Sequence, residues 1–386
     1  MFSLPYWRLS GFYFFYFAFV GAFTPFWSLY LQSLEFNAFQ IGVLMSLLQV
    51  SRIFAPNLWG WLADHTGRRV AVVQLAAFLS LIFYLGVFAG DSFIWMFVVM
   101  ALMSLFWSAS LPLVEAITLG HLGAGGEGYG RIRLWGSVGF IIAVIILGYV
   151  LDYAPVRALL WIVLGLKAGI FLLSRKIPEP KIVPHHTDDQ PVWNILRRPD
   201  VAAFLVACFL MAAAHGVYYT FYSIYLVEHG YSKSVVGWLW ALGVICEVLV
   251  FLWMPRMAAR FGLWRILIAS FALAALRFFL IGWGVEYILI IVFAQTLHAA
   301  SFGSFHAAAV ALVHQFFRGK HQAKGQGLYT SISFGLGGTL GGLMSGYTWD
   351  ALGADWSFSI SALFALAGYF VLLWRVRHAP STADAV

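Results

Sequence analysis

Apolar stretches long enough to cross a membrane alternate with short polar segments along almost the whole chain. An α-helix needs about 20 apolar residues to span the hydrocarbon core of a bilayer, and about twelve such spans can be placed here. The predicted spans cover residues 7–31, 38–62, 70–89, 93–121, 130–151, 156–174, 201–226, 234–254, 265–283, 286–316, 326–348 and 355–374. The pattern therefore predicts an all-α membrane protein.

One polar connection is much longer than the others. Residues 175–200 read RKIPEPKIVPHHTDDQPVWNILRRPD and are rich in proline and charge. Proline-rich polar sequence between two periodic regions is typical of a linker. We therefore predict an N-terminal six-helix bundle at 1–174, a linker at 175–200, and a C-terminal six-helix bundle with a short tail at 201–386.

The composition excludes a soluble protein. Of the 386 residues, 62% are hydrophobic and 10% are charged, whereas soluble domains carry about 25% charged residues. The two cysteines, Cys208 and Cys246, both lie in apolar spans. This placement favours two reduced core residues over a disulfide.

The distribution of charge predicts the orientation in the membrane. The formal net charge is +7, and most lysines and arginines lie at the termini or in loops after even-numbered spans. Loops after odd-numbered spans hold Arg157 and Lys233, and otherwise acids such as Glu35, Asp91 and Glu286. Because basic residues collect in cytoplasmic loops, we expect both termini and the linker to be cytoplasmic. The positive charge then requires no nucleic-acid partner.

Two basic turns at matching places suggest an internal repeat. GWLADHTGRR follows the second span, and PRMAARFGLWR follows the eighth span, at the matching place in the second half. The bias of basic residues towards the cytoplasm accounts for their charge. However, Gly60, Asp64, Gly67 and Arg68 at this spacing resemble the conformational loop motif of the major facilitator superfamily. The resemblance implies a transporter with two pseudo-symmetric halves and a substrate site near the middle of the membrane.

Ionisable and imidazole side chains interrupt the apolar spans. They are Arg52, Glu115, Arg133, Lys167, His215, Glu247, Arg277, His298 and His306. A charge at the bilayer centre costs at least ~2.5–3.5 kcal/mol on insertion scales, so such residues pair or line water-filled cavities. Arg277 and Lys167 are as well explained by stems that reach towards a membrane surface. Arg52 lies too deep for that, and Glu115 and Glu247 cannot reach a membrane surface well, which favours a functional role for all three.

Aromatic residues with polar tips form a stripe in the seventh span. His215, Tyr218, Tyr219 and Tyr222 have the i, i+3, i+4, i+7 spacing of one helical face. Such stripes usually belong to a core, but rings facing lipid would leave their hydroxyl groups unbonded. We therefore predict a wet cavity, which His298 of the tenth span would face from the other side.

Several segments resemble particular transporters of this superfamily. PLVEA, followed by YGRIRLWGSVGF, resembles the region of helices 4 and 5 in lactose permease, whose substrate-binding pair corresponds to Glu115 and Arg133. QTLHAAS resembles its helix 10 histidine segment and gives His298. The carboxylate three residues after that histidine in lactose permease is Ser301 here, and Glu247 lies about one helical turn from the position of its helix 8 carboxylate. The proton path therefore cannot be carried over from lactose permease.

The closer resemblance is to the phenylpropionate permease family. PFWSLYL, YGRIRLWGSVGF, HGVYYTFYSIYL, GYSKSVVGWLWALGVICEV and LHAASFGSFHAAA are similar to its signatures, and together they extend over nearly the whole chain. The resemblance implies the fold and the transporter class. It does not imply the solute, because one fold hosts many solutes.

Two sets of residues follow from these patterns and resemblances. The expected substrate-binding residues are Glu115, Arg133, Arg52, His215, Tyr218, Tyr219, Tyr222, Trp27 and His298. The expected proton-coupling residues are Glu247, His298, Glu115 and Arg277, with His215 as a further candidate. Glu115 and Arg133 come from adjacent spans and are expected to meet across the cavity, where each reduces the other's desolvation cost.

The combined prediction is a proton-coupled symporter for a small aromatic carboxylate. The aromatic lining suits an apolar ring, and Arg133 can grip a carboxylate with two parallel hydrogen bonds. Protonation of Glu115 would free Arg133 for the substrate. The alternative is a neutral sugar or nucleoside whose hydroxyl groups bind both residues. The expected partners are the small-molecule substrate, a proton and the lipid bilayer, with a monomer in a bacterial inner membrane.

Other classes of function have no support in the sequence. We find no metal-ligand spacing, phosphate-binding loop or nucleophile–base constellation, so we expect neither a cofactor nor an enzyme. A membrane sensor would carry a sizeable soluble output domain, whereas the longest polar stretch is the linker.

Overall fold

The computed structural model describes residues 4–123, 128–180 and 192–377, and these fold almost entirely into helices. The first half contains α1 (Tyr6–Gln32), α2 (Ala38–Thr66), α3 (Arg69–Tyr84), the 3₁₀ segment η1 (Leu85–Phe88), α4 (Phe93–Leu122), α5 (Tyr129–Tyr153) and α6 (Ala158–Ser174). The short α7 (Trp193–Leu196) precedes the second half. That half contains α8 (Pro199–Ala214), α9 (Gly216–Glu228), α10 (Lys233–Phe261), α11 (Leu263–Gly284), α12 (Ile288–Thr296), η2 (Ala299–Ser304), α13 (Phe305–Phe316), η3 (Gly319–His321), α14 (Gln322–Thr330), η4 (Ser331–Gly337), α15 (Gly338–Leu352) and α16 (Ala354–Arg377).

These helices confirm the predicted all-α membrane fold. In the described residues, ten helices, some made of consecutive segments, are long and apolar enough to cross a membrane. The sixth predicted span corresponds to the shorter apolar helix α6, and the eleventh is made of α14, η4 and α15. The end of α10 extends furthest beyond its predicted span, because polar residues continue this helix past its apolar part.

Three predicted spans of the second half are interrupted. The seventh divides into α8 and α9 at His215, and the tenth and eleventh contain the π-helical segments η2 and η4. Helices α1, α2, α4 and α5 of the first half have no such break. Because π-helical turns occur frequently at functional sites, the interruptions mark the second half as the more irregular wall of any site between the halves.

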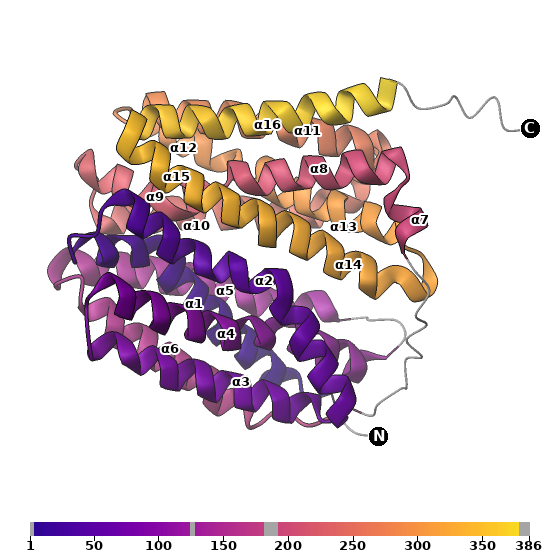
Figure 1. Ribbon diagram of the computed structural model, residues 1–386, viewed down its shortest axis with the longest axis horizontal. Helices are drawn as coiled ribbons and strands as arrows, with labels where there is room; N and C mark the ends of the chain where they lie inside the picture. Colours follow the sequence, from indigo (N-terminus) through magenta and orange to yellow (C-terminus); the bar gives the residue numbers. More distant parts are fainter. Residues whose placement is uncertain (1–3, 124–127, 181–191, 378–386) are drawn as a thin grey trace, which may run out of the picture.

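The two halves lie beside each other, with α1–α6 in one and α8–α16 in the other (Figure 1). They pack mainly through α5 against α10 and through α2 against α15. Helix α6 ends at Ser174 and α8 begins at Pro199. The domain boundaries at 174 and 201 remain a prediction, and residues 181–191 of the predicted linker lie outside the described residues.

The turn after α2 carries the predicted loop motif. Gly67 ends α2 with a left-handed φ of 64°, a conformation that favours glycine at the end of a helix. Asp64 forms an ion pair with Arg69, with 3.0 Å between Oδ1 and Nη2, rather than with Arg68. Gly60 lies inside α2, one turn before Asp64. The role of this motif in conformational change stays a prediction.

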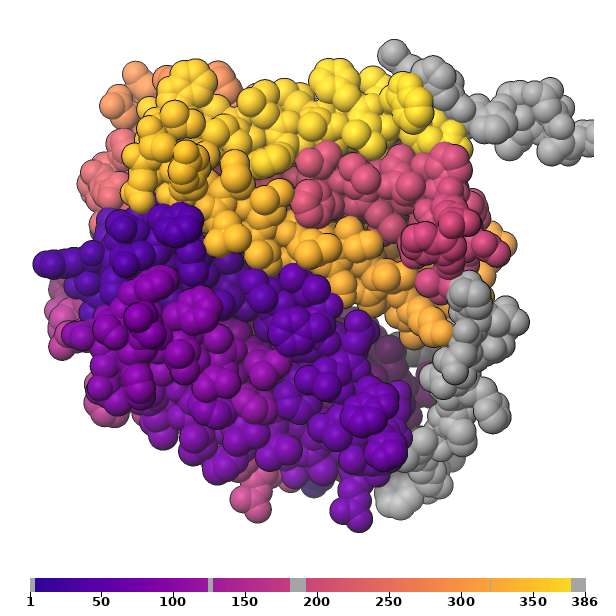
Figure 2. Space-filling view, in the orientation of Figure 1, coloured from indigo at the N-terminus to yellow at the C-terminus, as the bar shows by residue number. Residues whose placement is uncertain are grey.

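The halves contact each other closely at one end of the molecule and separate towards the other. Figure 2 shows the contact on the left and a hollow between the halves on the right. The right-hand end is also where α7 and the last turn of α16 lie in Figure 1. The space between the halves is therefore closed at the left-hand end.

Candidate functional site

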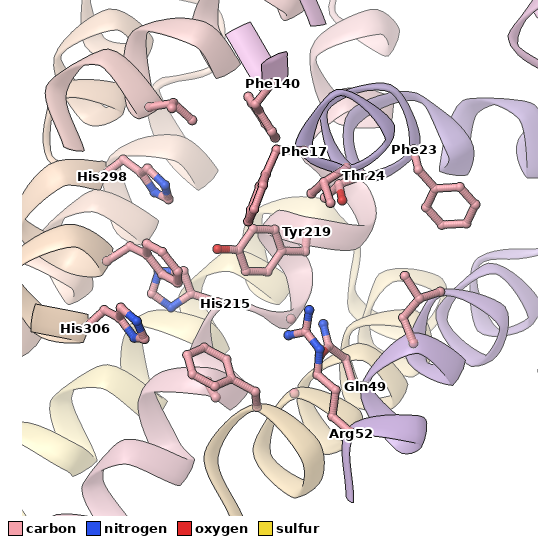
Figure 3. Close-up of a pocket in the computed structure, with 18 of the residues that line it drawn as sticks. Phe17, Phe23, Thr24, Gln49, Arg52, Phe140, His215, Tyr219, His298 and His306 are labelled. Atoms are coloured by element: carbon pink, nitrogen blue, oxygen red, sulfur yellow. The ribbon is translucent and has the colours of Figure 1, made fainter. Parts of the chain in front are cut away.

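A cavity of about 330 Å³ lies between the two halves (Figure 3). Its first wall comes from α1, α2, α4 and α5, and its second wall comes from α8, α9, α10, α13, α15 and the π-helical segments η2 and η4. The three interruptions in the second half therefore all lie at this cavity. Pockets of roughly 300–1,000 Å³ are typical of small-molecule sites.

Aromatic side chains make up much of the cavity lining. Both halves contribute, and the rings are Phe17, Phe23, Trp107, Phe140, Tyr219, Trp240, Phe251, Phe302, Phe305 and Phe334. Such a lining favours a ligand with an apolar, planar body, because aromatic pairs gain from stacked and edge-to-face contacts beyond the area they bury.

Two guanidinium groups reach the cavity from the first half. Arg52 of α2 and Arg133 of α5 both line it and are half-buried. The guanidinium carbon of Arg133 lies 3.8 Å from the ring centre of Phe17, a cation–π contact. Among the described residues neither arginine forms an ion pair or donates a hydrogen bond.

The amide of Gln49 lies beside the guanidinium of Arg52 (Figure 3). Gln49 is three residues before Arg52 on α2, and its Oε1 atom has no hydrogen-bond partner among the described residues. The first wall therefore offers one unused acceptor, the Gln49 Oε1 atom, beside the unused hydrogen-bond donors of two guanidinium groups. An anion at this wall would satisfy them, since charge-assisted hydrogen bonds from arginine to carboxylate are among the strongest in proteins.

Glu115 does not line the cavity, contrary to its expected role beside Arg133. Its Oε1 accepts a hydrogen bond of 3.2 Å from the hydroxyl of Tyr129. No ion pair joins Glu115 to Arg133 in the described structure, because Tyr129 supplies a nearer donor and Arg133 packs on Phe17. The two predicted partners come from neighbouring helices, but the structure does not bring them into direct contact.

The second half contributes a carboxylate and three imidazoles to the cavity. Glu247 of α10 lies 3.7 Å from His298, measured between Oε2 and Nε2. The rings of His298, Phe302 and His306 stack in order, with ring centres 5.4 Å and 5.8 Å apart. Both residues belong to the expected proton-coupling set, and the structure brings their side chains together at the cavity.

His215 lies at the break between α8 and α9 and also lines the cavity. Its Nδ1 is 2.9 Å from the carbonyl oxygen of Met211, so this nitrogen carries the proton and donates it. In the neutral ring the Nε2 atom is then an acceptor, and it has no partner among the described residues. His215 therefore has one free acceptor, and its ring centre lies 6.5 Å from that of His298.

The tyrosine stripe of the seventh span divides between the cavity and the core. Tyr219 lines the cavity, whereas Tyr218 and Tyr222 are fully buried behind it. The Tyr218 hydroxyl accepts a hydrogen bond of 3.1 Å from Gln295. Trp27 is also buried away from the cavity, where its Nε1 lies 3.3 Å from the sulfur of Met100. These three residues do not line the cavity in this structure, and their role in binding stays a prediction.

Arg277 and Lys167 do not reach a membrane surface. Arg277 is 0% exposed and donates to Gln295 Oε1 at 3.0 Å and to Ser301 Oγ at 3.3 Å. Lys167 is 3% exposed, and its Nζ donates to Ser80 Oγ at 2.9 Å, inside the first half. The alternative that their stems extend to the headgroups is wrong, because neutral oxygens and aromatic faces inside each half solvate both cations. Neither residue lines the cavity.

Three polar residues near the site were given no role by sequence analysis. His306 and Gln49 line the cavity, and Gln295 connects Arg277 to Tyr218. Gln49 lies one helical turn from Arg52, so a shared face with that arginine was the available signal. Gln295 lies in the span of His298, but periodicity does not reveal that its amide bonds to three other helices, α9, α10 and α11.

The two walls differ in chemistry. The first wall presents two cations to the cavity, and the second presents a carboxylate beside imidazoles. This arrangement can bind an anion with an aromatic body on one side and exchange a proton on the other. In the described part of the chain, no group of three or more histidine, cysteine, aspartate or glutamate side chains could hold a metal ion.

Comparisons with known proteins place this chain and its fold among transporters. The model of the MFS_1 like family matches residues 6–360. The "Probable 3-phenylpropionic acid transporter" of Escherichia coli is 29% identical over 379 residues, which cover 97% of this chain and 98% of that protein. The "Maltose permease" of Geobacillus stearothermophilus is 27% identical, over 95% of this chain and 93% of that protein.

Nucleoside transporters are also similar. The "Nucleoside permease NupG" of Escherichia coli is 23% identical over 90% of this chain and 90% of that protein. The crystal structure of the D323A mutant of nucleoside transporter NupG superposes with a TM-score of 0.86, covering 96% of this chain and 99% of that chain at 20% identity. These relatives and structures are transporters rather than enzymes.

Proposed function

This chain belongs to the MFS_1 like family and is an integral membrane secondary transporter of the major facilitator type, and we propose that it carries a small aromatic carboxylate together with a proton. The observation that carries this proposal is the pair Arg52 and Arg133. Both cations face an aromatic-lined cavity, and neither is paired with an acid of the described chain. A carboxylate substrate would supply the missing negative charge, and its ring would pack on the lining.

The similarity to the probable 3-phenylpropionic acid transporter supports this substrate class. The similarity to NupG supports the alternative of a neutral nucleoside or sugar. For such a solute, Gln49, Tyr219 and the arginines would serve as hydrogen-bond donors and acceptors. The two arginines favour the acid, because burying unpaired cations costs more than a neutral ligand recovers.

Glu247 and His298 are the proposed proton-coupling pair. They lie 3.7 Å apart at the cavity wall opposite Arg52 and Arg133, so a proton can be held near the substrate without contacting the substrate's carboxylate. Arg277 lies behind this wall, with its guanidinium 4.1 Å over the ring of Tyr218. Tyr218 in turn packs against the His298 ring, at 5.6 Å between centres. Arg277 thus acts on the pair through neighbouring groups.

The proposed transport cycle follows from the closed and open ends of the molecule. Rocking of the halves would alternately expose the central cavity to the two sides of the membrane. The end that is open here carries the basic turn after α2, so on the expected topology it faces the cytoplasm. We propose a monomer in a bacterial inner membrane with both termini cytoplasmic, captured here in an inward-facing state.

The charge that crosses the membrane distinguishes the two substrate classes. A membrane potential contributes about 2.3 kcal/mol for each charge moved through 100 mV. One proton moving with one monocarboxylate carries no net charge, so the potential does not drive this transport. A one-unit pH gradient supplies about 1.4 kcal/mol, or tenfold accumulation. We therefore expect proteoliposomes to accumulate a labelled aromatic acid after a pH step. A valinomycin-imposed, inside-negative potential at equal pH should give almost no accumulation.

Passive permeation requires a control in this experiment. Aromatic acids in their uncharged, protonated form cross lipid bilayers unaided. The protein-dependent rate of uptake is therefore the initial rate in proteoliposomes minus that in protein-free liposomes under the same pH step. A panel of labelled sugars and nucleosides should show no protein-dependent uptake. Strong potential-driven accumulation of the acid at equal pH would contradict one-to-one symport and would require two or more protons per monocarboxylate. Potential-driven uptake of a labelled sugar or nucleoside would instead favour the neutral solute.

A further inference from the structure

Two aspartates at the closed end bind helix N-termini of the opposite half. The Asp152 carboxylate, at the end of α5, accepts hydrogen bonds from the backbone N–H groups of Lys233 at 2.7 Å and Ser234 at 3.2 Å, where α10 begins. The Asp350 carboxylate, near the end of α15, accepts one from the backbone N–H of Phe39 at 3.0 Å, where α2 begins. Each aspartate therefore joins the two halves, and the two connections run in opposite directions.

A short sequence repeat underlies these two contacts. The end of α5 reads Gly148-Tyr-Val-Leu-Asp152 and the end of α15 reads Gly346-Tyr-Thr-Trp-Asp350, so both match Gly-Tyr-x-x-Asp. Spans 5 and 11 occupy equivalent places in the two halves, as do spans 2 and 8, whose N-termini receive the carboxylates. The pseudo-symmetry of the fold therefore places the same device at two sites.

Glycines bring the backbones together at both sites. A β-carbon added at Gly148 would lie 2.6 Å from the carbonyl oxygen of Lys233, and one added at Gly237 would lie 2.6 Å from that of Val144. At the second site, a β-carbon at Gly346 would lie 2.7 Å from the carbonyl oxygen of Ala38. Real β-carbons essentially never approach backbone atoms this closely, so each site depends on the absence of a side chain.

The energetics of these contacts depend on the conformation. Helix N-termini carry unpaired N–H groups and a partial positive charge, and a nearby carboxylate stabilises both. The donors and acceptors lie on different halves, so the bonds exist only while this end is closed. A contact made in one state and lost in the other shifts the equilibrium between them.

We infer that the two Gly-Tyr-x-x-Asp segments (148–152 and 346–350) form a paired latch that holds this end of the cavity closed, and that both must release for it to open. The inference rests on the proposed alternating access of the cavity. It does not depend on which solute is carried. On the expected topology the latched end is the extracellular side.

Distances between spin labels test the latch without any substrate. Tyr153 at the end of α5 and Leu352 at the end of α15 are exposed positions on opposite halves at this end, suited to labelled cysteines. Cys208 and Cys246 would first be replaced by alanine, and the protein reconstituted in lipid nanodiscs. The otherwise unaltered chain should give a single short distance. Asp152→Ala with Asp350→Ala should add a longer one.

The expected size of the effect is about tenfold in the ratio of open to closed molecules for the double variant, which corresponds to about 1.4 kcal/mol. Each single variant should give about threefold, because contributions from distant sites add. Asp91→Ala is the matched control, since Asp91 is an exposed acid at the same end with no described bond to the other half. An unchanged distance distribution in the double variant would overturn the latch.

Glycine variants provide an independent arm in case the aspartate variants fold poorly. Gly148→Ala and Gly237→Ala should also populate the longer distance, because a methyl group cannot fit at either contact. Gly165→Ala should not, since an added β-carbon there meets nothing within 4 Å. If the latch variants open this end but the unaltered protein takes up no aromatic acid, the latch stands and the proposed substrate fails. If uptake is normal and no variant opens this end, the latch fails alone.

Discussion

Replacing Arg133 with glutamine should reduce the protein-dependent uptake of an aromatic acid by about 100-fold. The expected loss is roughly 2–5 kcal/mol, the usual cost of removing one partner from a buried, hydrogen-bonded charge pair. Arg52→Gln should have an effect of the same order, since Arg52 faces the same cavity and is likewise unpaired. Initial rates in proteoliposomes under a pH step, corrected with protein-free liposomes, measure both effects.

Three comparisons separate substrate binding from a loss of folding. Arg131→Gln removes an exposed arginine two residues before Arg133 on α5 and should leave uptake unchanged. Arg133→Lys keeps the charge but not the two-pronged geometry, and it should recover only part of the rate. The uncharged amide of the same aromatic acid should be a poor competitor. Near-normal uptake by Arg52→Gln and Arg133→Gln together would remove both residues from the binding role.

Most of the fold was predictable because bilayer thickness fixes helix length. The requirement for about 20 apolar residues per span sets the number and position of the helices, and the observed helices match those spans. The breaks in the second half were not predictable from hydropathy. A π-helical turn such as η2 changes which backbone groups form hydrogen bonds with each other. It needs no change in the apolar pattern of the sequence, so hydropathy does not reveal it.

The site was predictable in its residue types but not in its pairings. A charged residue deep in a span indicates a cavity or a partner, and Arg52, Arg133 and Glu247 do line the cavity. The partner itself depends on rotamers and on neighbouring donors. Tyr129 is one turn before Arg133 on the same helix and bonds to Glu115. Sequence periodicity places both side chains near Glu115 and cannot rank them.

The helical stripe of the seventh span illustrates a second limit. One face of a helix can contact more than one neighbouring helix, so a single stripe of residues can border both a cavity and the core. Tyr219 faces the cavity, but Tyr218 is covered by Gln295 and Arg277 from two other helices. The repeat at Asp152 and Asp350 is a third case, because a match of three residues in five gains meaning only when both copies lie at equivalent contacts.

Replacing Glu247 with glutamine should abolish accumulation driven by a pH gradient while leaving substrate exchange intact. In one-to-one symport, a pH step of one unit supports about tenfold accumulation, and this should fall to a ratio of about one if the proton no longer travels with the substrate. Exchange of external label for preloaded acid needs no net release of the proton, so it should continue at a comparable rate.

Glu115→Gln is the matched control, because Glu115 is also a half-buried carboxylate within a helix but lies off the cavity and bonds to Tyr129. His298→Gln tests the partner at 3.7 Å and should weaken accumulation if the imidazole receives or passes on the proton of Glu247. Accumulation that survives in Glu247→Gln but fails in Glu115→Gln would move the coupled proton from the second half to the first. Failure of exchange in Glu247→Gln would instead assign this carboxylate to substrate binding.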